Sequence, residues 1–189
     1  MTQNPLDQLT EWLSAASTTG LRIPNACVLS TLGLDGFPNA RSVAIKEVTA
    51  THVVVTGPTG SRKGRELDAD ARCAITVWWD SLGRQVRIQG TAAPLDAATA
   101  HAIFAERSRE SRIVANVSSQ GEPLRPGALE AAYAAAFASG VDPQMPDAWG
   151  GWAIEPHRIE FMAFSDERFH RRTLWERGNG AWVSTALQP

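Results

Sequence analysis

Short links between β-rich segments restrict the fold of this chain more than any other feature. The segments rich in β-branched and other apolar residues are residues 26–32, 40–46, 52–56, 72–79 and 85–91. The link at residues 34–38 contains the Asp-Gly pair typical of hairpins, and residues 80–83 form another tight connection. Parallel neighbours need a crossover of about a dozen residues or more, so we expect mostly antiparallel pairing.

Helices and further strands complete the expected fold. The helices are expected at residues 4–16, 96–106 and 127–138, and the later strands at residues 152–154, 158–164, 169–176 and 181–185. Asn4 and Asp96 are candidate caps, Pro5 suits a first helical turn, and Gly178-Asn-Gly180 suits the last hairpin. The pattern favours a mainly β (α+β) fold, an antiparallel barrel with flanking helices. We expect one domain over residues 1–189, with 149–189 as its C-terminal strand region.

Charge and composition exclude several classes of protein. The 18 Lys and Arg residues against 20 Asp and Glu residues give a net charge of -2, which argues against whole-surface binding of nucleic acid or an anionic membrane. The apolar stretch at residues 131–141 is shorter than the roughly 20 residues that span a bilayer. The N-terminus does not resemble a leader, and Cys27 and Cys73 show no paired spacing, so we expect a cytoplasmic protein. The histidines show no metal-ligand spacing, so we expect no metal.

Residues 59–67 form a turn after a β segment and open a helix. Ser61 is placed to cap this helix, so Arg62 and Lys63 fall in its first turn. The positive end of a helix dipole disfavours cations there by about 0.3–1 kcal/mol. A bound phosphate monoester would explain both residues, and two solvated cations on a surface turn are the alternative.

Residues 39–46 carry cations on both faces of an expected strand. Alternation places Arg41 and Val43 on one face, with Ser42 and Lys46 on the other. An edge strand with solvated charges would look the same.

The run Arg168-Phe-His-Arg-Arg172 is the strongest indication of an anion site. In a strand, Arg168, His170 and Arg172 would share one face at steps of about 7 Å. Three such groups repel one another unless an anion lies against them, and arginine offers forked hydrogen bonds to one. A solvated edge strand balanced by neighbouring carboxylates is the alternative.

Two further segments carry weaker indications. Gln85 offers an amide donor and acceptor that suit the edge of a heterocycle. Residues 106–112 read as a solvated helix end, although Arg107 and Ser111 could face a common anion.

Several short motifs together resemble the pyridoxamine/pyridoxine 5'-phosphate oxidase family, in matching order along nearly the whole chain. They are Arg41 to Lys46, Gly60-Ser-Arg-Lys63, Gly83-Arg-Gln85, Trp149-Gly-Gly-Trp152, Ile159-Glu-Phe161 and Arg168-Phe-His-Arg-Arg172. The resemblance implies an FMN-binding split barrel and a homodimer with the flavin at the subunit interface.

The resemblance also implies roles for individual residues. The FMN contacts would be Arg41, Ser42, Val43, Lys46, Ser61, Arg62, Lys63, Gln85, Gln120 and Arg172. The contacts to a small phosphorylated heterocyclic substrate would be Lys46, Arg107, Ser111, Arg168 and His170. Arg168 and His170 would also be the catalytic pair, orienting the pyridine over the flavin.

Some positions depart from the family pattern. Met162 replaces a tryptophan, Ile103 a tyrosine that helps bind the substrate phosphate, and Gly121 a serine, while Thr56-Gly57 replaces an aromatic-threonine pair. The chain also starts at its first helix, so we expect the family's N-terminal covering segment to be missing. Flavin binding is expected to survive these changes, whereas substrate identity stays open.

The implied reaction transfers hydride from the substrate C4' carbon to flavin N5. Dioxygen then reoxidises the flavin, giving hydrogen peroxide and pyridoxal 5'-phosphate. One alternative is an FMN-dependent oxidase of another small heterocycle, of the phenazine-biosynthesis type. Another is a non-catalytic protein that binds flavin or pyridoxal phosphate.

Overall fold

The computed structural model describes residues 4–189, and its elements match most of those expected. The strands are β1 (Ala26–Leu32), β2 (Pro38–Val48), β3 (Val53–Pro58), β4 (Arg72–Trp79), β5 (Arg84–Pro94), β6 (Trp149–Ala163), β7 (Arg171–Gly178) and β8 (Ala181–Leu187). The helices are α1 (Pro5–Ser17), α2 (Arg62–Ala69), α3 (Ala97–Ala105), α4 (Arg109–Val117) and α5 (Ala128–Ala138).

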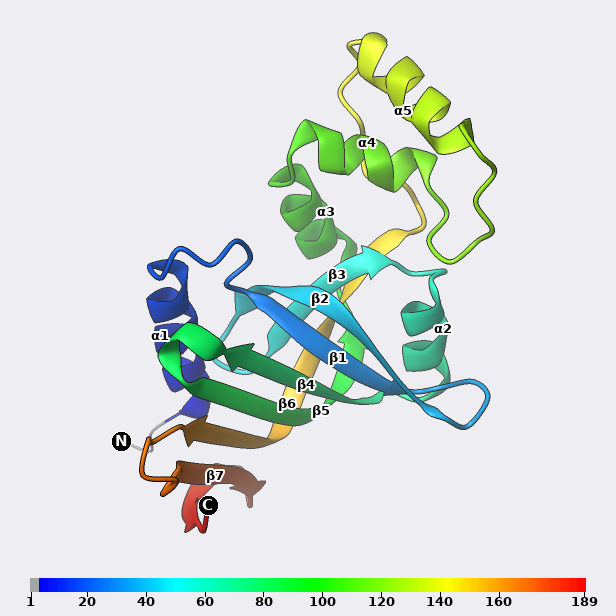
Figure 1. Cartoon of the computed structure of the whole chain (residues 1–189). Helices are drawn as coiled ribbons and strands as arrows, with labels where there is room; N and C mark the ends of the chain where they lie inside the picture. Colours follow the sequence, from blue (N-terminus) through cyan, green and yellow to red (C-terminus); the bar gives the residue numbers. More distant parts are fainter. Residues whose placement is uncertain (1–3) are drawn as a thin grey trace.

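Antiparallel pairing closes six of the strands into a barrel (Figure 1). The sheet order is β3-β2-β1-β4-β5-β6-β7-β8, and β3 pairs with β6 as well as with β2. The remaining strands, β7 and β8, form a hairpin that extends from β6. The predicted antiparallel barrel with flanking helices is therefore confirmed.

Strand β6 is a single element where the sequence suggested two short strands. It pairs with β5 from Trp152 to Ala163, while its other edge pairs first with β3 and then, from Arg158 onward, with β7. A register shift lets β6 continue past Pro156, a residue that seemed to separate two strands. One strand thus joins the barrel to the C-terminal hairpin.

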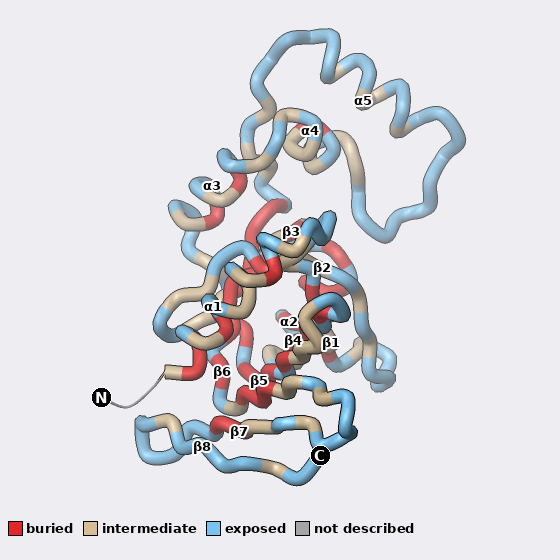
Figure 2. Tube along the Cα trace, turned by 60° about the vertical axis from the view of Figure 1, so that its left-hand side comes forward, coloured by how far each residue is buried: buried red, intermediate tan, exposed pale blue. Residues whose placement is uncertain are grey.

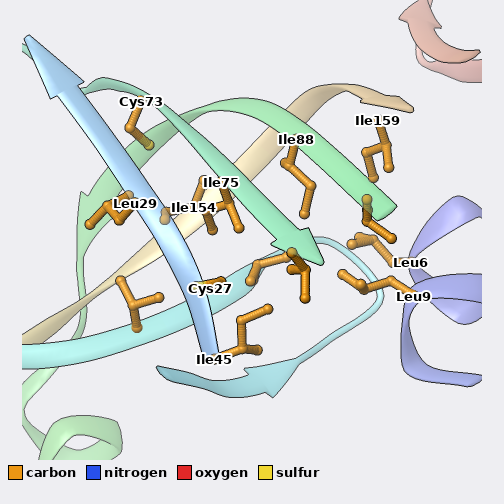
Figure 3. Packing of buried hydrophobic residues seen from close by; sticks show 14 of the residues in the cluster. Leu6, Leu9, Cys27, Leu29, Ile45, Cys73, Ile75, Ile88, Ile154 and Ile159 are labelled. Carbon is orange, nitrogen blue, oxygen red and sulfur yellow. The ribbon is translucent and has the colours of Figure 1, made fainter. Parts of the chain in front are cut away.

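The barrel interior is filled by aliphatic and aromatic side chains from every barrel strand (Figure 3). Helix α1 closes one end, where Leu6 and Leu9 point into the core. The Asn4 side chain accepts a hydrogen bond from the Leu6 amide, as its predicted capping role requires. Helix α2 lies at the opposite end of the barrel in Figure 1.

Helices α3, α4 and α5 form an arm outside the barrel, which we call the helical arm (residues 97–138). In both overall views it lies at the end of the molecule opposite the β7–β8 hairpin (Figures 1 and 2). Residues 106–112 are not one helix end, because the Ser108 hydroxyl accepts from the Ser111 amide and starts α4. Helix α5 has no buried residue in the described structure.

The expected strand at residues 169–176 begins later, at Arg171, and this removes the predicted alignment of three cations. Arg168 has φ of 67° and its amide donates to the Ser165 carbonyl, so the chain turns there. Arg168 and His170 therefore lie in the loop between β6 and β7, and only Arg172 lies on the strand.

Cys27 and Cys73 are free thiols, and both are buried in the barrel. Burial raises the pKa of Cys27 to about 12 and that of Cys73 to about 11, so both stay protonated thiols. Within residues 4–189 no cluster of metal-ligating side chains occurs. No helix in the same range is long and apolar enough to cross a membrane.

Candidate functional site

A cavity of about 750 Å³ opens between the barrel and the helical arm. Its walls come from β2, from β3 and the start of α2, from α4 with the loop that follows it, and from Trp149 at the start of β6. The volume falls within the range of about 300–1,000 Å³ found for small-molecule sites.

Most residues predicted to contact the cofactor or the substrate meet at this cavity. Those lining it are Arg41, Ser42, Val43, Lys46, Ser61, Arg62, Lys63, Arg107 and Gln120. The others predicted for the site, which do not line it, are Gln85, Ser111, Arg168, His170 and Arg172. One chain therefore brings together only part of the predicted site.

A buried carboxylate, Glu66 of α2, organises one wall of the cavity. It accepts hydrogen bonds from Arg41 Nη2 at 2.6 Å and Arg62 Nε at 2.8 Å. It also accepts from Thr31 Oγ1 at 2.6 Å and Asn39 Nδ2 at 2.8 Å. Burial alone would raise the pKa of Glu66, but these hydrogen bonds outweigh it and lower the pKa to about 2.

The two arginines on this wall are consequently paired with carboxylates. Arg41 also donates to the Leu29 carbonyl and to Thr31 Oγ1. Arg62 binds Glu66 and, at 2.7 Å, Asp35 of the β1–β2 hairpin. Both guanidinium groups are thus held in place, with their charge largely compensated.

Within residues 4–189 Lys63 has no carboxylate partner, and it lies nearly buried on the cavity wall. Its ammonium donates to Ser61 Oγ at 2.8 Å and to Gln120 Oε1 at 2.9 Å. Burial first, and repulsion from Arg41 second, lower the pKa of Lys63 to about 8. A methyl group at Gly57 would come within 2.8 Å of Lys63 Nζ, so the glycine leaves room for this ammonium.

The expected role of Ser61 as a side-chain cap is wrong. Ser61 occupies the N-cap position of α2, but its hydroxyl donates to the Pro58 carbonyl and accepts from Lys63. The hydroxyl is therefore used to position the lysine, and the start of α2 keeps its positive end directed at the site.

Lys46 and Arg107 line another part of the cavity. Arg107 stacks on the Trp149 indole, with the guanidinium carbon 4.2 Å from a ring centroid, and donates to the Ser111 carbonyl at 3.0 Å. Burial lowers the pKa of both Arg107 and Lys46, and Arg107 adds to the lowering at Lys46. The two cations are thus close enough to repel each other.

The cavity therefore carries an excess of positive charge, although Glu106 is close enough to Lys46 to raise its pKa and offset part of the charge there. Among the residues described, Lys46, Lys63 and Arg107 take part in no salt bridge. Buried polar atoms without a partner also belong to its lining residues Thr56, Arg107 and Trp149. Lys63 is buried and Arg107 is half-buried, and cations in such places are costly without counter-charges, so this arrangement suits an anionic ligand.

Ser111 lies on α4, where its carbonyl accepts from Arg107. The other predicted residues outside the cavity form a second group at the far end of β6. Gln85 pairs across the sheet with Met162, which in turn pairs with Arg172. The Arg172 guanidinium donates to Glu160 Oε1 at 2.8 and 2.9 Å and to the Gln188 carbonyl at 3.3 Å. Strand β7, which carries Arg172, lies on the opposite side of the barrel from the helical arm (Figure 1).

The loop before β7 adds His170 and Arg168 to the second group. His170 Nδ1 accepts from the Ser165 amide at 3.2 Å, which leaves Nε2 as the protonated nitrogen of the neutral ring. The His170 ring contacts Phe164, with centroids 4.4 Å apart, and Phe164 contacts Trp78. The Arg168 side chain is exposed to solvent.

Two site residues were not singled out from the sequence. Glu66 follows Arg62 by four residues on one helix, a spacing that could have indicated an ion pair. Trp149 lies in the Trp-Gly-Gly-Trp motif, yet nothing local indicates that its ring would support Arg107. Both act through long-range packing, which a sequence pattern does not display.

Comparison with protein families gives two matches that together cover most of the chain. Residues 13–138 match the family model described as pyridoxamine 5'-phosphate oxidase. Residues 149–189 match the model described as the pyridoxine 5'-phosphate oxidase C-terminal dimerisation region.

Individual proteins similar to this chain are named pyridoxine/pyridoxamine 5'-phosphate oxidases. The pyridoxine/pyridoxamine 5'-phosphate oxidase of Sphingopyxis alaskensis is 41% identical, over 100% of this chain and 89% of that protein. Its namesake from Thermosynechococcus vestitus is 40% identical, over 99% of this chain and 90% of that protein.

Solved structures agree with the fold. PhzG from Burkholderia lata 383, in complex with tetrahydrophenazine-1-carboxylic acid, superposes with a TM-score of 0.93 at 33% identity and covers 98% of this chain and 93% of its own. A pyridoxamine 5'-phosphate oxidase-related, FMN-binding protein from Nostoc punctiforme has a TM-score of 0.83 at 16% identity, with complete coverage of both chains, which supports the fold alone.

Proposed function

This chain belongs to the pyridoxamine 5'-phosphate oxidase family, and from that membership we propose that it is an FMN-dependent oxidase of pyridoxamine or pyridoxine 5'-phosphate. The observation that carries the proposal is the cavity lined by three cations without carboxylate partners. Both the cofactor and the substrate in this proposal carry a phosphate. Lys63 on one wall of the cavity, and Lys46 with Arg107 on another, could each bind one of these phosphates.

The chain's own residues divide the proposed work. Lys63, fixed by Ser61 and Gln120, would hold the phosphate of FMN, with Arg41 and Arg62 beside it. Lys46 and Arg107 would hold the phosphate of the substrate. Bound FMN supplies the hydride-accepting chemistry, and dioxygen is the proposed final acceptor.

The second group of residues is proposed to complete the site of a partner protomer. None of Gln85, Arg168, His170 and Arg172 lines the cavity of its own chain, and strand β7, which carries Arg172, lies at the end of the molecule opposite the helical arm (Figure 1). A two-fold symmetric dimer places one copy's surface on its partner's, so it can bring this group to the partner's cavity. The match of residues 149–189 to a dimerisation region supports a homodimer.

A phenazine-type substrate is the second candidate. The 33% identity to PhzG, whose structure contains tetrahydrophenazine-1-carboxylic acid, favours it, as do Ile103 and Met162 at positions where a tyrosine and a tryptophan were expected. The uncompensated Lys46 and Arg107 also accommodate a carboxylate, although a phosphate dianion would use both charges more fully.

Anaerobic mixing of the FMN-loaded protein with substrates tests the proposal. Pyridoxamine and pyridoxine 5'-phosphate are expected to bleach the flavin absorbance, while pyridoxamine and pyridoxine do not. Oxygen should then restore the colour and release hydrogen peroxide. Bleaching only by a tricyclic carboxylate would favour the second candidate, and FMN that binds without any bleaching would indicate a non-catalytic protein.

The lowered pKa of Lys63 predicts a pH dependence of FMN binding. Below about pH 8 the ammonium is charged and attracts a phosphate, and above that pH the free protein loses this charge. The FMN dissociation constant, measured by flavin fluorescence, is expected to rise as the pH passes through about 8 to 9. In Lys63→Met this step should disappear, and a wild-type constant that stays flat to pH 10 would contradict the assignment.

A further inference from the structure

Arg107 is held by an unusual set of contacts for a cation at a binding site. Its guanidinium lies 4.2 Å from the centroid of a Trp149 ring and 5.8 Å from that of Phe104. Phe104 packs edge-on against Trp149, with centroids 5.4 Å apart, and so helps to hold the indole ring in place. One hydrogen bond, to the Ser111 carbonyl, fixes the direction of the guanidinium fork.

This arrangement leaves the charge of Arg107 uncompensated while restricting its motion. A carboxylate partner would also position an arginine, as Glu66 positions Arg41, but it would cancel the charge that an anionic ligand needs. An aromatic face attracts a guanidinium through its quadrupole and adds no full negative charge. Trp149 is well suited to this purpose because it is buried at the cavity wall.

We propose that Trp149 is a positioning residue that determines specificity, holding the Arg107 guanidinium toward Lys46 so that the pair selects substrates with a phosphate group. The inference rests on the proposed function and adds a residue to it. Recognition of the anion would then depend on a preorganised arginine, at a site where Ile103 offers no hydroxyl.

The test measures binding of 4-deoxypyridoxine 5'-phosphate, which has neither an oxidisable 4'-hydroxyl nor an aldehyde, to the FMN-loaded protein by equilibrium dialysis. Trp149→Phe is expected to weaken this binding by about threefold to tenfold, with no change for unphosphorylated 4-deoxypyridoxine. In steady-state assays the same variant should raise KM for the phosphorylated substrate and leave kcat nearly unchanged. Trp182→Phe, the same substitution at a tryptophan beside Arg177, is the matched control and should change neither constant.

A second variant and a double variant separate positioning from a general structural effect. Arg107→Lys keeps the charge but loses the planar stack, so it should behave like Trp149→Phe without disturbing the barrel. In an Arg107→Ala background, Trp149→Phe should have no further effect, because the tryptophan acts through the arginine. Additive losses, or equal losses for the phosphorylated and unphosphorylated ligands, would overturn the inference.

These outcomes are distinct from failure of the proposed function. If the wild-type protein binds the phosphorylated analogue no better than the unphosphorylated one, the proposed substrate class is wrong. If the wild type prefers the phosphorylated analogue and Trp149→Phe keeps that preference, only the role of Trp149 is wrong.

Discussion

Mixing two inactive variants is expected to restore about a quarter of the wild-type activity, provided that each site is built from two protomers. The variants are Lys63→Ala, which removes an ammonium from the cavity, and Arg168→Ala, which changes the exposed loop before β7. After the subunits exchange, about half of the dimers contain one copy of each variant. Because each site takes Lys63 from one chain and Arg168 from the other, both substitutions fall in one site of the mixed dimer. The other site of that dimer is intact, so about a quarter of all sites are active.

The control for this experiment mixes two variants whose altered residues both line the cavity of one chain. Lys63→Ala mixed with Lys46→Ala leaves one lesion in every site of the mixed dimer, so no activity should return. A site contained within one chain would give no recovery with either pair. Activity at limiting FMN, measured before and after subunit exchange, distinguishes the arrangements. Recovery with the control pair, or none with the test pair, would contradict a shared site.

Replacing Glu66 with alanine is expected to have the largest effect on stability. The substitution leaves Arg41, Thr31 and Asn39 without the buried carboxylate that accepts their hydrogen bonds. Removing one partner of a buried ion pair typically costs about 3–5 kcal/mol of folding free energy. Urea unfolding followed by circular dichroism should show this loss. Asp68→Ala, a carboxylate without a salt bridge on the same helix, is a suitable control.

The pH dependence of unfolding provides a second test of Glu66. Its pKa is lowered from 4.5 to about 2 in the folded protein, so its contribution to stability is complete above pH 4.5 and is lost as the pH falls toward 2. Glu66→Gln has no such titration, and its deficit relative to wild type should shrink across that range. A deficit that stays constant from pH 6 to pH 3 would mean that the carboxylate charge does not matter.

Much of the barrel could be predicted from local sequence signals. The hairpin between β1 and β2 follows from an Asp-Gly turn, and the caps at Asn4 and Asp96 are used as expected. The failures occurred where tertiary contacts override local signals. Pro156 does not end β6, because the register shift against β5 accommodates it. The loop at Arg168 adopts a left-handed backbone that strand alternation does not anticipate.

The candidate site was predictable as a set of residues but not as an arrangement. The cations at positions 41, 46, 62, 63 and 107 do gather at one cavity. Their division into compensated and uncompensated groups depends on Glu66, which reaches Arg41 and Arg62 from within the fold. Periodicity assigns faces to residues, but it does not indicate which charges meet once the sheet curls into a barrel.

The length of β6 determines how far apart two parts of the proposed dimer lie. The strand carries Trp149 at one end and Met162 near the other, a span of up to about 40 Å at roughly 3.3 Å per residue. In the proposed dimer, each protomer would therefore place two sites apart along one strand, which is paired on both edges with β3, β5 and β7 and has one register shift against β5 at Pro156. The helical arm is tied to the same frame, because Arg107 stacks on Trp149 and Gln120 accepts a hydrogen bond from Lys63.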